Sequence, residues 1–222
     1  MASPAPRPVY TPDAFNVRLL DADDAPAYRN LRHYIMIVGD GRYFGSSYTR
    51  EDGFQTETDW RNWCKPCPEH SLFGIFHGKE LIGVMGAVQY GRPEEKTVEW
   101  EATYLKEEYR FYGLAKTCYE AVKAWTIQQG YKRAIVYIRE DNERSRQIRE
   151  RQGFQYTHTI RNEKWADGST ANCDAFSLDL VGGVTDSKPK AGQNAPIITV
   201  EPHREVLPSV AGQSANVQLS RA

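Results

Sequence analysis

Segments with the pattern of strands and segments with the pattern of helices alternate from residue 15 to residue 180. Their order is strand, helix, three strands, helix, strand, helix and two strands. This alternation predicts an α/β domain with a mixed sheet. With 222 residues, 40% of them hydrophobic, the chain can bury one substantial core, so we expect a single domain over 15–180.

The first predicted strand, "FNVRLL", precedes a helix that starts among acidic residues with Pro26 in its first turn. Later strands form a hairpin that turns at Gly78. In the second helix, Leu114, Cys118, Val122 and Trp125 recur at helical spacing. The remaining predicted segments are strands at 97–105 and 132–138, a charged helix at 142–152, and a final hairpin of strands at 154–165 and 173–180.

The two ends of the chain differ in composition from this domain. Residues 1–14 are rich in Pro and Ala, and residues 181–222 contain no Phe, Tyr or Trp. Such segments bury too little apolar surface to offset the entropy of ordering them, so we expect extended or disordered arms. The apolar patches "PIITV" and "VLPSV" in the second arm are suited to adding a strand to the sheet of a protein partner.

Charge and hydropathy exclude some classes of function. The 28 basic and 29 acidic residues nearly cancel, which gives no signal for nonspecific binding to nucleic acid or to a membrane surface. No apolar run is long enough to span a bilayer, and the first residues lack the apolar core of a signal peptide. We expect a cytoplasmic protein, with a virus particle or another assembly as the alternative location. The exposed final hairpin leaves a homo-oligomer open.

Cys64, Cys67 and His70 lie three residues apart in "CKPCPEH", a spacing that can bring soft ligands around zinc. A zinc site needs a fourth ligand, and the sequence has no second Cys-x-x-Cys. We therefore expect a proline-bearing loop with small buried thiols and no metal, and zinc is the lesser alternative. Four cysteines are too few for a disulfide scaffold in a chain of this length.

The stretch "EEYRFYGLAK", residues 107–116, joins a predicted strand to a helix expected to begin near Tyr112. The N–H groups in the first turn of a helix have no partner within the helix, and the helix dipole places positive charge there. Gly113 and Ala115 carry so little side chain that an anion can come close to these groups. The pattern Arg-x-x-Gly-x-Ala therefore predicts a cradle for a diphosphate.

This turn, the strand before it, the helix after it and the later stretch "NERSRQIRERQGFQ" together resemble the acetyl-CoA-binding core of the GNAT acetyltransferase superfamily. The family signature is Arg/Gln-x-x-Gly-x-Gly/Ala, followed by a helix that begins at an asparagine and ends in Gly-Phe. The resemblance covers about residues 15–180 and includes "FGSSY" at 44–48. It implies a mostly antiparallel central sheet flanked by helices. It also implies that acetyl-CoA is the acyl donor to a primary amine of a small molecule, a peptide N-terminus or a lysine.

The resemblance further assigns residues to acetyl-CoA. Backbone groups of the 110–116 loop would bind the pyrophosphate, and the strand at 103–105 would pair with the pantetheine arm. Asn142 falls at the family's asparagine, with Ser145 facing the same cofactor. A plain N-cap at Asn142, worth about 1 kcal/mol, is compatible with that role. The predicted cofactor-binding residues are Thr103, Leu105, Arg110, Phe111, Tyr112, Gly113, Leu114, Ala115, Lys116, Asn142, Ser145 and Arg149.

Glu99 and Glu101 are the candidate bases. They lie two residues apart on a predicted strand, so their side chains point to one face. A carboxylate in an apolar cleft can take the proton that an amine must lose before it attacks a thioester. Glu99 lies eleven residues before the signature arginine, where some family members carry their general base. The alternative is a pair of ordinary carboxylates on a solvated face.

Arg149 stands where many family members carry a tyrosine that protonates the leaving thiolate. An arginine cannot donate a proton usefully near neutral pH, although it can stabilise a thiolate. Tyr137, on the preceding strand, is the substitute acid if its side chain reaches the cleft. Arg149 also belongs to a run with Arg144, Arg146 and Arg151. Such a run is typical of a solvated helix face, and the sharper alternative is contact with the adenosine phosphate of coenzyme A or with an acidic partner.

Two functions follow from these observations. The first is an acetyl-CoA-dependent N-acetyltransferase whose acceptor cleft has the aromatic and polar segment 42–68 as one wall. The alternative is a catalytically weak or inactive protein of the same fold, in a large assembly such as a virus particle, that binds partners through its arms. The arginine at position 149 and the long second arm motivate this alternative.

Overall fold

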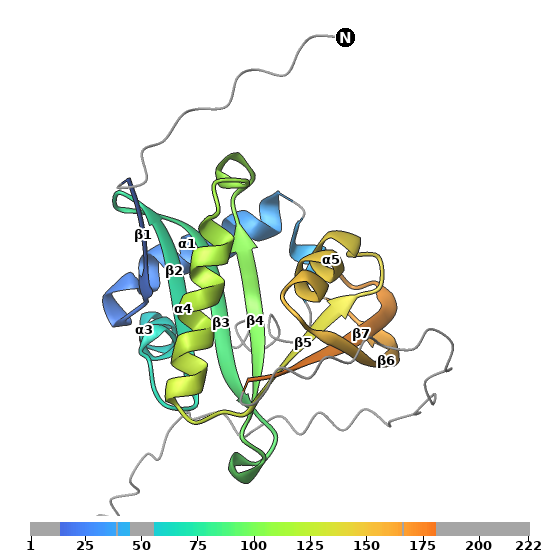
Figure 1. Cartoon of the computed structure of the whole chain (residues 1–222). Helices are drawn as coiled ribbons and strands as arrows, with labels where there is room; N and C mark the ends of the chain where they lie inside the picture. Colours follow the sequence, from blue (N-terminus) through green and yellow to red (C-terminus); the bar gives the residue numbers. More distant parts are fainter. Residues whose placement is uncertain (1–13, 39, 45–55, 166, 181–222) are drawn as a thin grey trace, which may run out of the picture.

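The computed structural model describes residues 14–38, 40–44, 56–165 and 167–180. Most of the predicted first arm, the whole second arm and most of "FGSSY" lie outside these residues. The described strands are β1 Phe15–Leu19, β2 His70–His77, β3 Glu80–Tyr90, β4 Thr97–Leu105, β5 Arg133–Arg139, β6 Gln155–Lys164 and β7 Thr170–Asp179. The described α-helices are α1 Ala25–Ile37, α3 Glu57–Cys64, α4 Leu114–Gln128 and α5 Glu143–Arg151. The predicted alternation is confirmed, and Figure 1 shows its arrangement.

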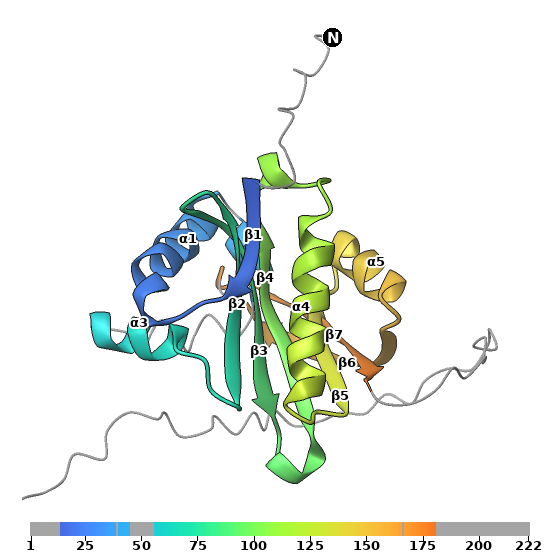
Figure 2. The same ribbon diagram turned by 60° about the vertical axis from the view of Figure 1, so that its left-hand side comes forward.

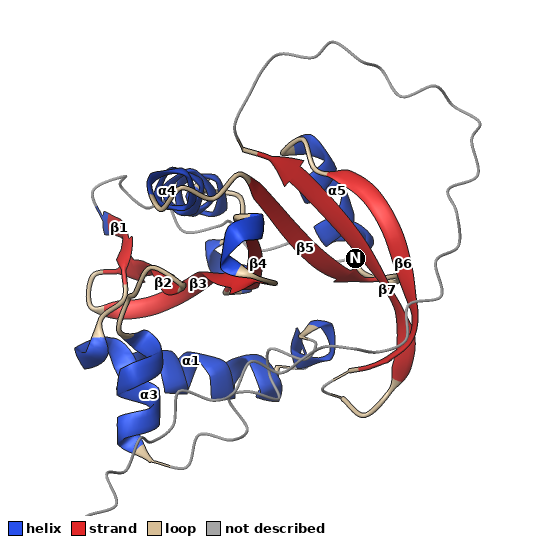
Figure 3. Cartoon of the chain, turned by 90° about the horizontal axis from the view of Figure 1, so that it is seen from below, coloured by secondary structure: helices blue, strands red, loops and turns tan. Residues whose placement is uncertain are grey.

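The seven strands form one sheet in the order β1-β2-β3-β4-β5-β7-β6. Each pair of neighbours is antiparallel except β4 and β5, which run parallel because α4 carries the chain across between them. Helices α4 and α5 cover one face, and α1 and α3 cover the other (Figures 2 and 3). The predicted mixed, mostly antiparallel sheet flanked by helices is therefore confirmed.

Helix α4 is fixed to the sheet by the apolar stripe that the sequence predicts. Leu114, Cys118, Val122 and Trp125 are all buried. The next residue along the chain, Thr126, is fully buried; its hydroxyl donates to the carbonyl of Val122 and accepts from the indole of a tryptophan on β4. The Thr126 hydroxyl, although fully buried, is thus paired as donor and as acceptor.

The start of α4 differs from the prediction. The helix begins at Leu114, two residues after the expected Tyr112. Gly113 is its N-cap with φ of 78°, a left-handed conformation that interrupts the helical backbone and that glycine adopts at low cost. Phe111, two residues earlier, also has a positive φ of 79°. The chain therefore makes a sharp turn before the helix rather than entering it gradually.

Strands β4 and β5 pair over a short length only. Thr97–Glu99 is in register with Arg133–Ile135, and beyond these three pairs the strands part. An irregularity in β4 falls just past this point: Glu101 pairs with Gly86 and Tyr104 with Val84, so β4 carries one extra residue. Ala102, within this bulge, has φ of 52°. The parting and the bulge together open the sheet between β4 and β5, as seen from below in Figure 3.

The Cys-x-x-Cys segment is not the loop of buried thiols that we expected. Cys64 ends helix α3 and is fully buried, but Cys67 is exposed. His70 begins β2, and its ring lies on that of Trp63 with centroids 3.9 Å apart. Within the described ranges, no group of three or more His, Cys, Asp or Glu side chains is placed to bind a metal.

The structure also bears on membrane association. Of the helices in the described part of the chain, none has the length and apolar character needed to cross a bilayer.

Candidate active site

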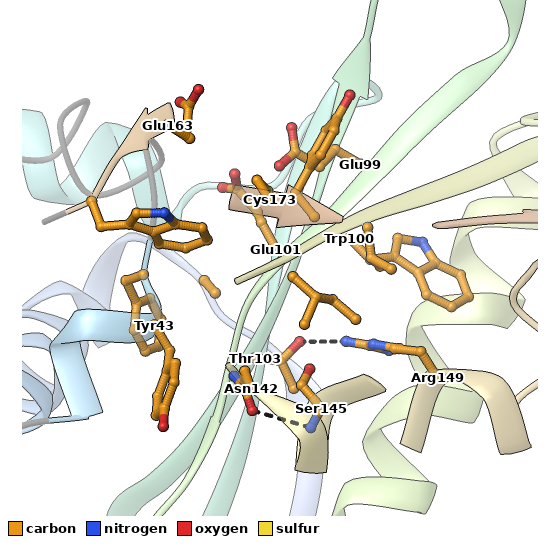
Figure 4. Close-up of a pocket in the computed structure, with 16 residues that line it drawn as sticks. Tyr43, Glu99, Trp100, Glu101, Thr103, Asn142, Ser145, Arg149, Glu163 and Cys173 are labelled. Atoms are coloured by element: carbon orange, nitrogen blue, oxygen red, sulfur yellow. Dashed lines mark hydrogen bonds between the residues drawn. The ribbon is translucent and has the colours of Figure 1, made fainter. Parts of the chain in front are cut away.

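A pocket lies where β4 and β5 part (Figure 4). Its walls come from β4, β5, the start of α5, the β6–β7 hairpin and the short segment at 43–44. The parting of the strands brings many predicted residues to this place. The predicted site residues that line it are Glu99, Glu101, Thr103, Tyr137, Asn142, Ser145 and Arg149.

Carboxylates gather toward one end of the pocket. Glu99 and Glu101 point into it from β4, as their spacing predicts, and Glu163 joins them from β6. Glu101 is only 7% exposed, whereas Glu99 is half-buried. The rings of Tyr43 and Trp165 also line the pocket. An acidic, aromatic pocket of this kind attracts a positively charged group.

Sequence reasoning missed Glu163 and Trp165. Strand β6 has a register irregularity between Ile160 and Glu163, and Asn162 within it has φ of 57°. The bulge changes which side chains face the pocket, so strand alternation alone does not predict Glu163. The aromatic segment at 42–68, expected as a cleft wall, does contribute Tyr43.

Tyr137 reaches the pocket from β5, as its predicted role requires. Its hydroxyl donates to the hydroxyl of Tyr90 at 2.8 Å, and the two rings lie with centroids 6.1 Å apart. Tyr90 ends β3 and Tyr137 lies on β5, so this contact spans β4, the strand between them. The hydrogen bond fixes the position of the Tyr137 hydroxyl.

Arg149 lies toward the other end of the pocket, opposite the carboxylates (Figure 4). It is 5% exposed. Its guanidinium donates to the hydroxyl of Thr103 at 2.8 Å and to the side-chain oxygen of Gln152 at 3.0 Å. Burial lowers the pKa of Arg149 to about 10, so the side chain still carries its charge at neutral pH.

The arginine run on α5 is therefore not one solvated face. Arg144 and Arg151 are exposed, as that interpretation requires. Arg146 instead forms an ion pair with the buried Asp174 of β7 at 2.5 Å, and Arg149 faces the pocket. The prediction of a solvated run was wrong for these two residues because α5 packs its 146 and 149 positions against the sheet.

Asn142 acts as the N-cap of α5. Its side-chain oxygen accepts from the backbone N–H of Ser145 at 3.1 Å. Both residues line the pocket, so the cap and a contact with a ligand are compatible. The cap fixes the first turn of α5 beside the opening in the sheet.

The 110–116 loop lies outside the pocket lining, at the N-terminus of α4. The first helical hydrogen bonds are made by the amides of Lys116 and Thr117 to the carbonyl of Gly113, so the amides of Leu114 and Ala115 precede them. A Cβ added at Gly113 would meet nothing within 4 Å, which shows open space in front of the helix end. This loop therefore fits a diphosphate.

Side chains around this loop support that fit. Arg144 places its guanidinium over the ring of Phe111, 5.5 Å from the centroid, and so brings positive charge from α5 to the loop. Arg110 turns back, and its Nε donates to the carbonyl of Leu105 at 2.9 Å. Arg110 thus fixes the loop on the end of β4.

Comparison with known proteins places these features in a family. Residues 40–154 match the family model described as the acetyltransferase (GNAT) family. No curated protein sequence matches the chain.

Solved structures share the fold at low sequence identity. An N-acetyltransferase of Staphylococcus aureus superposes with a TM-score of 0.62 at 18% identity, over 75% of this chain and 99% of that one. The yncA protein of Salmonella typhimurium, solved with its cofactor acetyl-CoA, gives 0.62 at 13% identity over 78% and 98%. RimL, a ribosomal L7/L12 alpha-N-protein acetyltransferase in complex with coenzyme A, gives 0.61 at 16% identity over 78% and 96%.

Proposed function

The chain belongs to the GNAT acetyltransferase family, and from this premise we propose that it is an N-acetyltransferase that moves an acetyl group from acetyl-CoA to a primary amine. The observation that supports the proposal most directly is the pocket between the parted strands β4 and β5. Carboxylates that can deprotonate an amine lie at one end of it, and the helix terminus that fits a diphosphate lies nearby, on the helix that follows β4.

Acetyl-CoA, when bound, supplies an acetyl group activated as a thioester. The backbone at 110–116, with Arg144 beside it, would bind the diphosphate. Asn142 and Ser145 at the start of α5 and Thr103 on β4 would flank the path from there into the pocket. These residues orient the donor so that its carbonyl carbon faces the carboxylate end.

The acceptor amine would enter at the carboxylate end. Amines are protonated near neutral pH, and Glu99, Glu101 and Glu163 attract the ammonium group. We assign the role of base to Glu99, because it is half-buried and so can pass the proton on to solvent. The more deeply buried Glu101 would keep the cation in place. Tyr137, whose hydroxyl is fixed by Tyr90, is the candidate that returns a proton.

Three acceptors fit this description: a small amine, a peptide N-terminus and a lysine. RimL, with its alpha-N-protein activity, makes a peptide N-terminus a reasonable member of any test set. The alternative of a structural protein that binds partners through its arms concerns segments outside the described residues, and the pocket gives it no support.

The test is release of free thiol from acetyl-CoA in the presence of a panel that contains small diamines, short peptides with free N-termini and peptides with an internal lysine. We expect thiol release with at least one class, and mass spectrometry then identifies the acetylated nitrogen. Binding of acetyl-CoA without transfer to any member would count against this acceptor range. Failure to bind acetyl-CoA by calorimetry would overturn the proposal itself.

A further inference from the structure

Arg149 is a buried cation whose hydrogen bonds and ring contact are all with neutral groups. Its two hydrogen bonds go to the hydroxyl of Thr103 and the amide oxygen of Gln152. Its guanidinium also lies 5.7 Å from the centroid of the Phe154 ring. Within the described ranges, no carboxylate comes within ion-pair distance of it. Arg146, three residues earlier, differs from Arg149 in this respect, because it forms an ion pair with Asp174.

A buried charge without a counter-ion is costly, commonly by several kcal/mol. Hydrophobic side chains at such positions are often as stable or more stable, so packing alone does not account for an arginine here. The cation lies in the opening between β4 and α5 and lines the pocket. A negative charge brought or generated by a ligand in this pocket would complete the site.

We infer that Arg149 is a catalytic residue that stabilises the negative charge on the sulfur leaving the acetyl group, so that the C–S bond can break without the proton that Tyr137 is the candidate to return. The inference rests on the proposed function, and it concerns the step in which the C–S bond breaks and the sulfur leaves. The guanidinium keeps hydrogen-bond donors beyond the two that bind Thr103 and Gln152, since it has five N–H groups. Its position is fixed by those two bonds before any ligand arrives.

The step balances without a further reactant. The amine nitrogen attacks the carbonyl carbon, the C–N bond forms, and the C–S bond breaks with its electron pair on sulfur. The ammonium first loses one proton to Glu99, which passes it to solvent, and the nitrogen loses its second proton by the same route once the C–N bond has formed. Arg149 stays protonated throughout and holds the thiolate as an ion pair, so that no side chain has to protonate the sulfur before product release.

Other titratable groups around Arg149 have to be separated from this effect. From α4, Cys118 and Tyr119 face it; burial raises the pKa of the Cys118 thiol to about 12 and also raises that of Tyr119. Both therefore stay neutral over the range in which a free thiol ionises. Glu99 and Glu101 from β4 and Tyr137 from β5 share the pocket. A ligand that lacks the thiol controls for all of these groups.

The test compares binding of coenzyme A with binding of desulfo-coenzyme A, in which hydrogen replaces the thiol. Calorimetric titrations at about pH 6.5 and about pH 9.5 bracket the ordinary thiol pKa of about 8.5. For the native protein we expect coenzyme A to gain roughly tenfold or more in affinity at the higher pH relative to the desulfo ligand, because a thiol pKa lowered by one unit gives about this factor.

Arg149→Met keeps the length of the side chain and removes its charge, and we expect it to lose that gain while still binding the desulfo ligand. Arg149→Lys retains the charge without the planar fork and should keep part of the gain. Thr103→Val, which removes one partner of the guanidinium, should keep most of it. Thermal melting shows whether each variant is folded, and we expect Arg149→Met to melt no lower than the native protein.

The outcomes distinguish the two proposals. If the two ligands depend on pH alike in the native protein, or if Arg149→Met retains the gain, the role of Arg149 is overturned while the proposed acetyl transfer stands. If neither ligand binds the native protein, the proposed function fails and the role of Arg149 fails with it.

Discussion

Two hydrogen bonds join β4 to helices on the same side of the sheet, and each involves a threonine hydroxyl. Trp100 donates its indole N–H to Thr126 of α4 at 3.1 Å, and Arg149 of α5 donates to Thr103 at 2.8 Å. The first bond is neutral, and the hydroxyl that accepts it donates in turn to the carbonyl of Val122. The second carries a charge for which the described residues supply no carboxylate.

The difference separates the core under α4, which stabilises the fold, from the opening between β4 and β5, which we propose binds the ligand. In the core under α4, the buried Thr126 hydroxyl and the Trp100 indole N–H are paired with each other, and an unpaired buried group would be costly. In the opening between β4 and β5, charges of both signs are buried on facing walls. Substitutions in the two regions should therefore separate stability from function.

The largest expected effect is on catalysis. Glu99→Gln removes the proposed base and keeps the shape of the side chain, so we expect turnover with an accepted amine to fall by roughly 10²- to 10⁴-fold. The melting temperature should stay unchanged, because Glu99 belongs to the pocket and not to the core. Thiol release at saturating amine measures the loss. Glu120→Gln, on the exposed side of α4, is the control, and equal activity in both variants would remove Glu99 from the mechanism.

A charge placed at the start of α4 tests the diphosphate cradle. Gly113→Glu puts a carboxylate into the open space before the helix, and repulsion of a diphosphate should weaken coenzyme A binding by more than about tenfold. Gly113→Ala is the matched control, because it carries the same left-handed strain, about 1 kcal/mol, without the charge. Calorimetry that finds equal affinities for the two variants would place the diphosphate elsewhere.

A change in the core should show the opposite pattern. Thr126→Val leaves the indole N–H of Trp100 buried without its acceptor, and we expect the free energy of unfolding to fall by about 2 kcal/mol. Thr126→Ser retains the hydroxyl and should lose less. Urea unfolding measures both variants, and coenzyme A affinity should not change. A loss of affinity in Thr126→Val would mean that the two regions are not separate.

The smallest effect lies at the boundary between the regions. Asn142→Ala removes the cap of α5 and should lower the free energy of unfolding by about 1 kcal/mol. Asn142→Asp restores the cap, because its carboxylate accepts the same bond from Ser145. If Asn142→Asp recovers stability and still binds coenzyme A more weakly than the native protein, Asn142 also contacts the ligand. If Asn142→Asp recovers both the stability and the coenzyme A affinity, Asn142 serves only as a cap.

The fold could be predicted largely from local patterns. The stripe of Leu114, Cys118 and Val122 marks α4, and alternation marks the strands, because burial of one face imposes a period on the sequence. Asn142 could be predicted as the N-cap of α5, since caps demand particular residue types. The start of α4 was expected near Tyr112, two residues before the helix begins. The roles assigned to the site residues stay predictions until tested.

Features that depend on distant pairing could not be predicted. The bulge at Ala102 arises from the register between β4 and β3, which local sequence does not specify. Glu163 faces the pocket for the same reason, through a bulge in β6. The burial of Arg149 depends on how α5 packs over the opening, so its charged sequence context wrongly favoured a solvated position for this residue.

Strands β4 and β5 share three residue pairs, whereas β5 and β7 share seven. The sheet is therefore weakest at its middle, and the strands on either side form two candidate units of local unfolding. A ligand in the opening would contact both units, so its binding free energy would stabilise the state in which both are folded. Native-state hydrogen exchange would then show β5 and β7 opening separately from β2 and β3 in the free protein, and the whole sheet opening as one cooperative unit in the complex.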